Sequence, residues 1–164
     1  MKELFYTFCF GKTNHGYYYL RQQENLLFSE AKFRTGDELY TNTFELKYHG
    51  DDVLAYKYGD GAWVDFTSQP AHHFPTSAYP LLLPKAFAQP YVYTAIAEED
   101  GAVLGRTTLR FENNDIIETR KGKMVRRFTL EKDLPVTIDW GGPVSFLCAS
   151  AAEAVRGSGV TFSS

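Results

Sequence analysis

The fold class is decided by one stretch of the sequence, which reads Asn42-Thr43-Phe44-Glu45-Leu46-Lys47-Tyr48. Phe44, Leu46 and Tyr48 occupy every second position, and the residues between them are polar. Successive side chains of a β-strand point to opposite faces of the sheet. The alternation therefore predicts a half-buried antiparallel strand with an apolar face rich in aromatic rings.

The same pattern recurs along the chain, in which Phe, Tyr and Trp make up 16% of the residues. Glycine- and aspartate-rich turns separate the alternating runs, which favours hairpins between neighbouring strands. We expect an all-β fold: a strongly curved antiparallel meander, or incomplete barrel, of about ten to twelve strands. The predicted strands cover residues 2–10, 16–22, 26–33, 39–48, 53–58, 62–66, 91–97, 102–111, 116–120, 124–130 and 136–140.

Two segments interrupt the alternation. Residues 67–77 contain two prolines and no periodicity, so they predict a loop. Residues 78–88 predict a short helix that plugs the curved sheet, because they are apolar nearly all round, with Ser77 as the N-cap. The Ala-rich residues 143–156 predict a C-terminal helix, and residues 157–164 a frayed end.

The composition predicts one globular domain over residues 1–164. The net charge of −3 and the scattered basic residues argue against nucleic-acid binding. No segment has the ~20 apolar residues of a membrane span. The first residues lack the features of a signal peptide, so we expect a cytoplasmic protein, or a periplasmic one if the chain is a mature form. Cys9 and Cys148 are expected to be reduced, buried thiols.

The sequence predicts no catalytic residue, no metal site and no cofactor. It has no nucleophile elbow, no glycine-rich phosphate loop and no metal-type spacing of His and Cys. The acidic groups at 51–52 and 98–100 lie at predicted turn tips, where solvated side chains are expected. His72 and His73 are the remaining catalytic candidates, and adjacent loop histidines more often diverge than converge.

Arg126 is the most informative charged residue, because it shares strand parity with Met124, Phe128 and Leu130. An unpaired charge on an apolar face is costly. An inward Arg126 therefore needs a carboxylate partner or an anionic ligand head group. The alternative, which the sequence favours, is a side chain that reaches outward to the solvent at the rim.

A curved sheet with an apolar inner face either encloses a packed core or leaves a ligand cavity. If Arg126 faces a cavity, it would bind an acidic head group through a charge-assisted hydrogen bond. The apolar tail would then lie on neighbouring strands and on the helical plug. The predicted ligand-binding residues are Arg126, Met124, Phe128, Leu109, Phe111, Tyr79 and Leu82.

The order of elements from Phe5 to Trp140, with Ala78-Tyr79-Pro80-Leu81-Leu82-Leu83 between two meanders, resembles the lipoprotein-carrier (LolA-like) half-barrels and the DUF3108-type bacterial proteins. The resemblance implies a curved sheet around a helix, and binding of an apolar ligand without catalysis. The first hypothesis is thus a non-catalytic binding module for an apolar or amphipathic, lipid-like small molecule. The alternative is a structural or interaction domain, for example a homodimer through a sheet edge. A third is an enzyme that uses His72 or His73.

Overall fold

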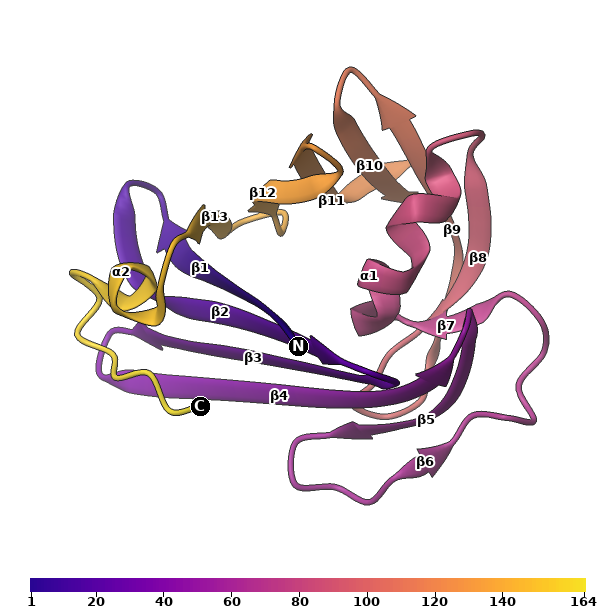
Figure 1. Ribbon diagram of the computed structural model, residues 1–164, viewed down its shortest axis with the longest axis horizontal. Helices are drawn as coiled ribbons and strands as arrows, with labels where there is room; N and C mark the ends of the chain where they lie inside the picture. Colours follow the sequence, from indigo (N-terminus) through magenta and orange to yellow (C-terminus); the bar gives the residue numbers. More distant parts are fainter.

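The computed structural model describes all residues, 1–164, and confirms the all-β prediction. Thirteen strands form a single curved, unclosed sheet (Figure 1). The strands are β1 (Lys2–Phe10), β2 (Thr13–Gln23), β3 (Leu26–Thr35), β4 (Glu38–His49), β5 (Asp52–Tyr58), β6 (Val64–Asp65), β7 (His73–Pro75), β8 (Tyr91–Ile96), β9 (Val103–Glu112), β10 (Asp115–Arg120), β11 (Lys123–Glu131), β12 (Leu134–Asp139) and β13 (Val144–Cys148).

Two meanders build the sheet, and both start or end at its middle. Strands β1 to β6 run outward in order on one side, and β13 back to β7 run outward on the other. The two meanders are joined where β1 pairs antiparallel with β13. The edges of the sheet are therefore β6 and β7, which follow each other in the chain. β7 pairs parallel with β8, so the predicted loop over 67–77 is wrong for these three residues.

A short helical segment lies on the inner side of the curve, as Figure 1 shows for α1. It consists of two 3₁₀ turns, η1 (Thr76–Ala78) and η2 (Leu83–Ala86), on either side of α1 (Tyr79–Leu82). Its buried residues include Ala78, Tyr79 and Leu82, as a plug requires. The Ser77 hydroxyl is not its N-cap. The Glu98 carboxylate instead accepts a hydrogen bond from the Ser77 N–H.

The main hydrophobic core fills the space between the plug and the concave face of the sheet. It contains 25 buried residues from nearly every strand, among them Phe44, Leu46, Tyr48, Leu109 and Phe128. The alternating residues that predicted the fold thus form its core, since Phe44, Leu46 and Tyr48 are all less than a tenth exposed. No helix of the structure has the length and apolar character needed to cross a membrane.

The predicted helix over 143–156 is correct only at its end. Residues Val144–Cys148 form β13, and the helix α2 comprises Ala151–Val155 with Ser150 as its N-cap. β13 pairs with both β1 and β12, so it closes the gap between the two meanders. A helix at Val144–Cys148 would leave the backbone groups on the facing edges of β1 and β12 without hydrogen-bond partners. The need to pair these edges outweighs the helix propensity of the segment.

The C-terminal tail is also ordered, which corrects the prediction of a frayed end. Phe162 packs against the rings of Phe5, Tyr17 and Tyr19, at centroid distances of 5.8, 5.0 and 5.2 Å. The Ser164 hydroxyl donates to the buried Glu30 carboxylate at 2.9 Å. Together with α2, the tail covers a second, smaller cluster of buried residues outside the main core.

We predict that Phe162→Ala lowers the free energy of unfolding by about 1–2 kcal/mol, less than the ~1.5–3 kcal/mol of a fully buried large apolar side chain, because Phe162 is only partly buried. Chemical denaturation of both proteins measures the difference. The exposed neighbour Thr161 offers a control, since Thr161→Ala is expected to change stability by less than about 0.5 kcal/mol. Equal stability of Phe162→Ala and the wild type would show that the tail does not hold this face.

Candidate functional site

A cleft of two adjoining chambers opens on the concave side of the sheet. The first, which we call the apolar chamber, has a volume of about 270 Å³ and is walled mainly by aromatic rings. Burial raises the pKa of Tyr18 in its wall to about 12, so this hydroxyl stays neutral and is hydrogen-bonded to Tyr79 at 2.8 Å. The lining residues are Phe8, Tyr18, Ser29, Ala31, Phe33, Asn42, Thr43, Phe44, Tyr58, Ser77, Tyr79, Arg126 and Trp140.

The second chamber, the polar chamber, has a volume of about 380 Å³ and is lined mainly by charged and hydroxyl groups. Five residues line both chambers, so the two are parts of one cleft: Asn42, Tyr58, Ser77, Arg126 and Trp140. The other residues that line the polar chamber are Thr76, Val125 and four charged residues. Two of these, Glu98 and Glu99, lie in the turn between β8 and β9, and the other two, Glu118 and Arg120, lie on β10.

The floor of the polar chamber is a buried ion pair between Arg126 of β11 and Glu118 of β10. Arg126 Nε donates to Glu118 Oε2 at 2.6 Å, and Nη2 donates to Oε1 at 2.9 Å. The Tyr93 hydroxyl donates to Oε1 at 2.6 Å, and Nη2 also donates to the Thr76 carbonyl at 2.8 Å. The pair is thus bidentate, the geometry that makes arginine–carboxylate contacts strong and directional.

A β-bulge brings the two charged residues opposite each other. Arg120 pairs with Lys123 and Thr119 with Met124, but the register shifts by one residue so that Glu118 pairs with Arg126. Without that shift Glu118 would face Val125, and Arg126 would pair with a residue of the other parity. The extra residue in β11 therefore creates the ion pair.

These contacts settle the position of Arg126. Only 7% of the residue is exposed, so the prediction of an outward side chain at the rim is wrong. The guanidinium carbon lies 5.0 Å from the Tyr79 ring centroid, 5.5 Å from that of Phe128 and 5.9 Å from that of Trp140. Its Nη1 makes no hydrogen bond within the protein and remains free for a ligand.

The electrostatics of the pair keep both partners charged. Burial by itself raises the pKa of Glu118, but the Arg126 charge and the hydrogen bonds from Arg126 and Tyr93 outweigh it, so the pKa lies below its ordinary value. Burial likewise lowers the pKa of Arg126, and the Glu118 carboxylate more than reverses this effect. The pair is therefore fully ionised near neutral pH.

The other predicted ligand-binding residues are divided between the core and the surface. Tyr79 lines the apolar chamber. Leu109, Phe128 and Leu82 are fully buried in the core, at 0%, 0% and 1% exposure. Phe111 is 39% exposed and packs on the edge of Phe87 at 5.3 Å. None of these last four lines either chamber.

Met124 is 42% exposed and lies outside the cleft, although it shares sequence parity with Arg126. The bulge between Met124 and Arg126 changes which face each residue occupies. Val125, which strict alternation would place outside, lines the polar chamber instead. Arg106 and Arg110 of β9 are exposed.

Sequence reasoning missed Glu98, which it placed among the solvated turn acids. Glu98 is only 7% exposed, because its carboxylate turns inward. It accepts hydrogen bonds from the Thr76 hydroxyl at 2.7 and 2.8 Å and from the Ser77 N–H at 2.5 Å. The rest of the turn behaves as predicted: Glu99 and Asp100 are exposed, and Asp100 bonds the Ala102 N–H.

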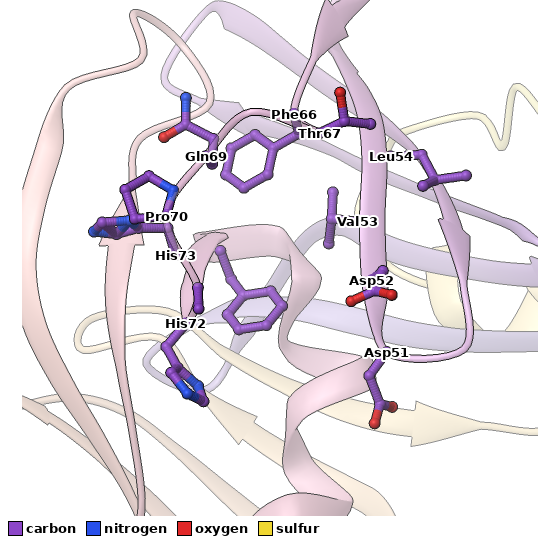
Figure 2. Close-up of a pocket in the computed structure, with 12 residues that line it drawn as sticks. Asp51, Asp52, Val53, Leu54, Phe66, Thr67, Gln69, Pro70, His72 and His73 are labelled. Carbon is purple, nitrogen blue, oxygen red and sulfur yellow. The ribbon is translucent and has the colours of Figure 1, made fainter.

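A separate pocket of about 280 Å³ lies between β5 and the segment that leads from β6 to β7. Figure 2 shows Asp51, Asp52, His72 and His73 around it, with the two imidazoles pointing in different directions. Asp51 is already paired with Lys85 at 2.8 Å, and His72 Nδ1 lies 3.2 Å from the Tyr91 hydroxyl. No group of three or more potential metal ligands is present.

Comparison with protein-family models, with curated proteins and with solved structures finds no match to this chain. The cleft itself is accordingly the basis for the functional argument.

We predict that Arg126→Met lowers the free energy of unfolding by about 3–5 kcal/mol, because it leaves Glu118 as an unpaired buried charge. The double variant Arg126→Met/Glu118→Leu is expected to recover most of that loss, since apolar replacements of buried pairs are often neutral. Denaturation of the wild type, both single variants and the double variant gives the coupling energy. Arg106→Met is the matched control at an exposed site. A fully stable Arg126→Met protein would contradict the assignment.

The lowered pKa of Glu118 predicts a pH dependence of stability. The charged pair stabilises the fold above the ordinary glutamate pKa of about 4.3, and this contribution is lost as pH falls through the lower folded-state pKa. The wild type and Glu118→Gln should therefore differ in stability at neutral pH and converge in acid. Unfolding curves at several pH values measure this convergence. The exposed Glu131, as Glu131→Gln, should differ little from the wild type at any pH.

Proposed function

We propose that this protein is a non-catalytic binding module for an amphipathic small molecule. The observation that carries the proposal is the division of one cleft into a ring-lined chamber and a charged chamber, with Arg126 and Trp140 in both. Ligand sites in proteins are mostly apolar concavities with a few well-placed polar groups. An apolar tail fits the first chamber, and a polar head fits the second.

The packing of the core supports a preformed site. The bidentate ion pair, the Tyr18–Tyr79 hydrogen bond and the stacking of Tyr79 on Phe128 at 4.8 Å fix the walls in place. A site with rigid walls loses little conformational entropy when a ligand binds. The resemblance of the layout to LolA-like half-barrels suggests the same class of ligand.

The proposal predicts that a ligand with an octyl or longer chain binds, and that Ala31→Phe weakens this binding about tenfold or more by filling the apolar chamber. Calorimetry or a fluorescent fatty-acid probe measures the affinity, and native mass spectrometry after gentle purification tests for a bound lipid. Ala62→Phe, at an exposed position, is the matched control. If no amphiphile binds the wild type, or if Ala31→Phe binds as tightly, the proposal fails.

Self-association through a sheet edge is a second candidate. It is favoured by three exposed apolar residues at the β6 edge: Leu54, Trp63 and Val64, at 39%, 40% and 43% exposure. The ladder of β6 is only two residues long, and Lys47 Nζ lies 4.1 Å above the Trp63 ring, both of which limit pairing with another strand. Sedimentation over a range of concentrations distinguishes the two candidates, since a strict monomer argues against the second.

A further inference from the structure

Three charged residues of the polar chamber form no ion pair within the protein: the exposed Glu99 and two buried or half-buried residues of opposite sign, Glu98 and Arg120. Glu118 and Arg126 neutralise each other, with two hydrogen bonds between them. Glu98 and Arg120 line the same chamber, but neither forms an ion pair within 4.0 Å with any group of the chain.

Glu98 is a buried carboxylate that is hydrogen-bonded only to neutral groups. It receives the Thr76 hydroxyl and the Ser77 N–H, and no cation contacts it. A carboxylate accepts about four hydrogen bonds, so its two oxygens retain capacity for a further donor. A buried carboxylate without a cation is costly, and a cationic or strongly donating ligand group removes that cost.

Arg120 presents the opposite requirement. Its Nε donates to the Thr107 hydroxyl at 2.9 Å, while Nη2 is buried without any hydrogen-bond partner. A guanidinium cannot lose its charge in a protein. Because Nη2 is closed off by burial, Nη1, which makes no hydrogen bond, is the Arg120 nitrogen that can donate to a ligand acceptor, best an anionic one. Nη1 of Arg126, which lines the same chamber, also makes no hydrogen bond and is a further free donor.

We infer that the head group bound in the polar chamber is zwitterionic, with its cationic part at Glu98 and its anionic part at Arg120 and Arg126. This inference rests on the proposed binding function. A purely anionic head would satisfy Arg120 but meet the unpaired Glu98 carboxylate, and a purely cationic head would meet the reverse conflict. A ligand that carries both charges satisfies both residues at once.

The test compares four ligands with the same octyl tail: octyl phosphoethanolamine, octyl phosphate, octylamine and octyl glycerol. In the wild type the zwitterion should bind about tenfold or more tightly than each of the other three, as expected for one additional charge-assisted hydrogen bond. Calorimetry gives the four dissociation constants. This ranking needs no variant, so it decides the inference even where a substitution disturbs folding.

Two substitutions that each remove one charge then assign the two ends of the head group. Glu98→Gln should bring octyl phosphate within about threefold of the zwitterion, and Arg120→Gln should do the same for octylamine, each by removing one charge requirement. Glu131→Gln and Arg106→Gln, both at exposed positions away from the cleft, should leave the ranking unchanged.

The outcomes separate the inference from the proposed function. If all four ligands bind with similar affinity and Ala31→Phe still weakens them, the cleft binds amphiphiles but the zwitterion inference is wrong. A clear preference for octyl phosphate or for octylamine in the wild type overturns it as well. If none of the four binds, the proposed function itself fails.

Discussion

The buried pair of Glu118 and Arg126 is the interaction on which the rest of the site depends. Two charges inside a hydrophobic core are tolerated only when each is fully hydrogen-bonded. Glu118 meets this condition through Arg126 and Tyr93, whereas Arg126 meets it through Nε and Nη2, which donate to Glu118 and the Thr76 carbonyl, but not through Nη1. The pair thereby links β8, β10, β11 and the start of the helical plug. The cleft opens beside the pair, which lines its polar chamber.

Most of the sheet could be predicted from the sequence, because its signal is local. Alternation with a period of two, and turns rich in glycine and aspartate, marked eleven of the strands. The errors fall where long-range demands prevail. Residues 144–148 became a strand because β1 and β12 each needed a neighbour. Phe162 became ordered because rings from β1 and β2, distant in the sequence, form a surface for it.

The site was harder to predict than the fold, for a specific geometric reason. Parity placed Arg126 on the apolar face, where it would need a carboxylate or an anionic ligand, but the favoured interpretation turned its side chain outward to the rim, which the structure contradicts. Parity could not identify Glu118, because a regular hairpin through Lys121 and Gly122 would pair Glu118 with Val125. The one-residue bulge reverses that assignment, and bulges of this type leave little trace in a single sequence. The burial of Glu98 was missed because the acidic residues that follow it in the same turn, Glu99 and Asp100, are exposed, and the sequence does not distinguish Glu98 from them.

The connectivity explains why the cleft lies where it does. The first and last strands, β1 and β13, lie at the middle of the sheet, and the plug follows the edge strand β7 directly. This short tether holds the plug against the β8–β11 half, where Tyr79 stacks on Phe128 and Phe87 packs on Phe111. The facing inner surface of β3 and β4, around Ala31 and Thr43, lies beyond the plug and lines the apolar chamber instead. A ligand tail in that chamber would cover the inner face of β3 and β4, as the plug covers the inner face of the β8–β11 half. The fold therefore leaves an apolar surface open next to Glu98 and Arg120, two charged residues without an ion-pair partner.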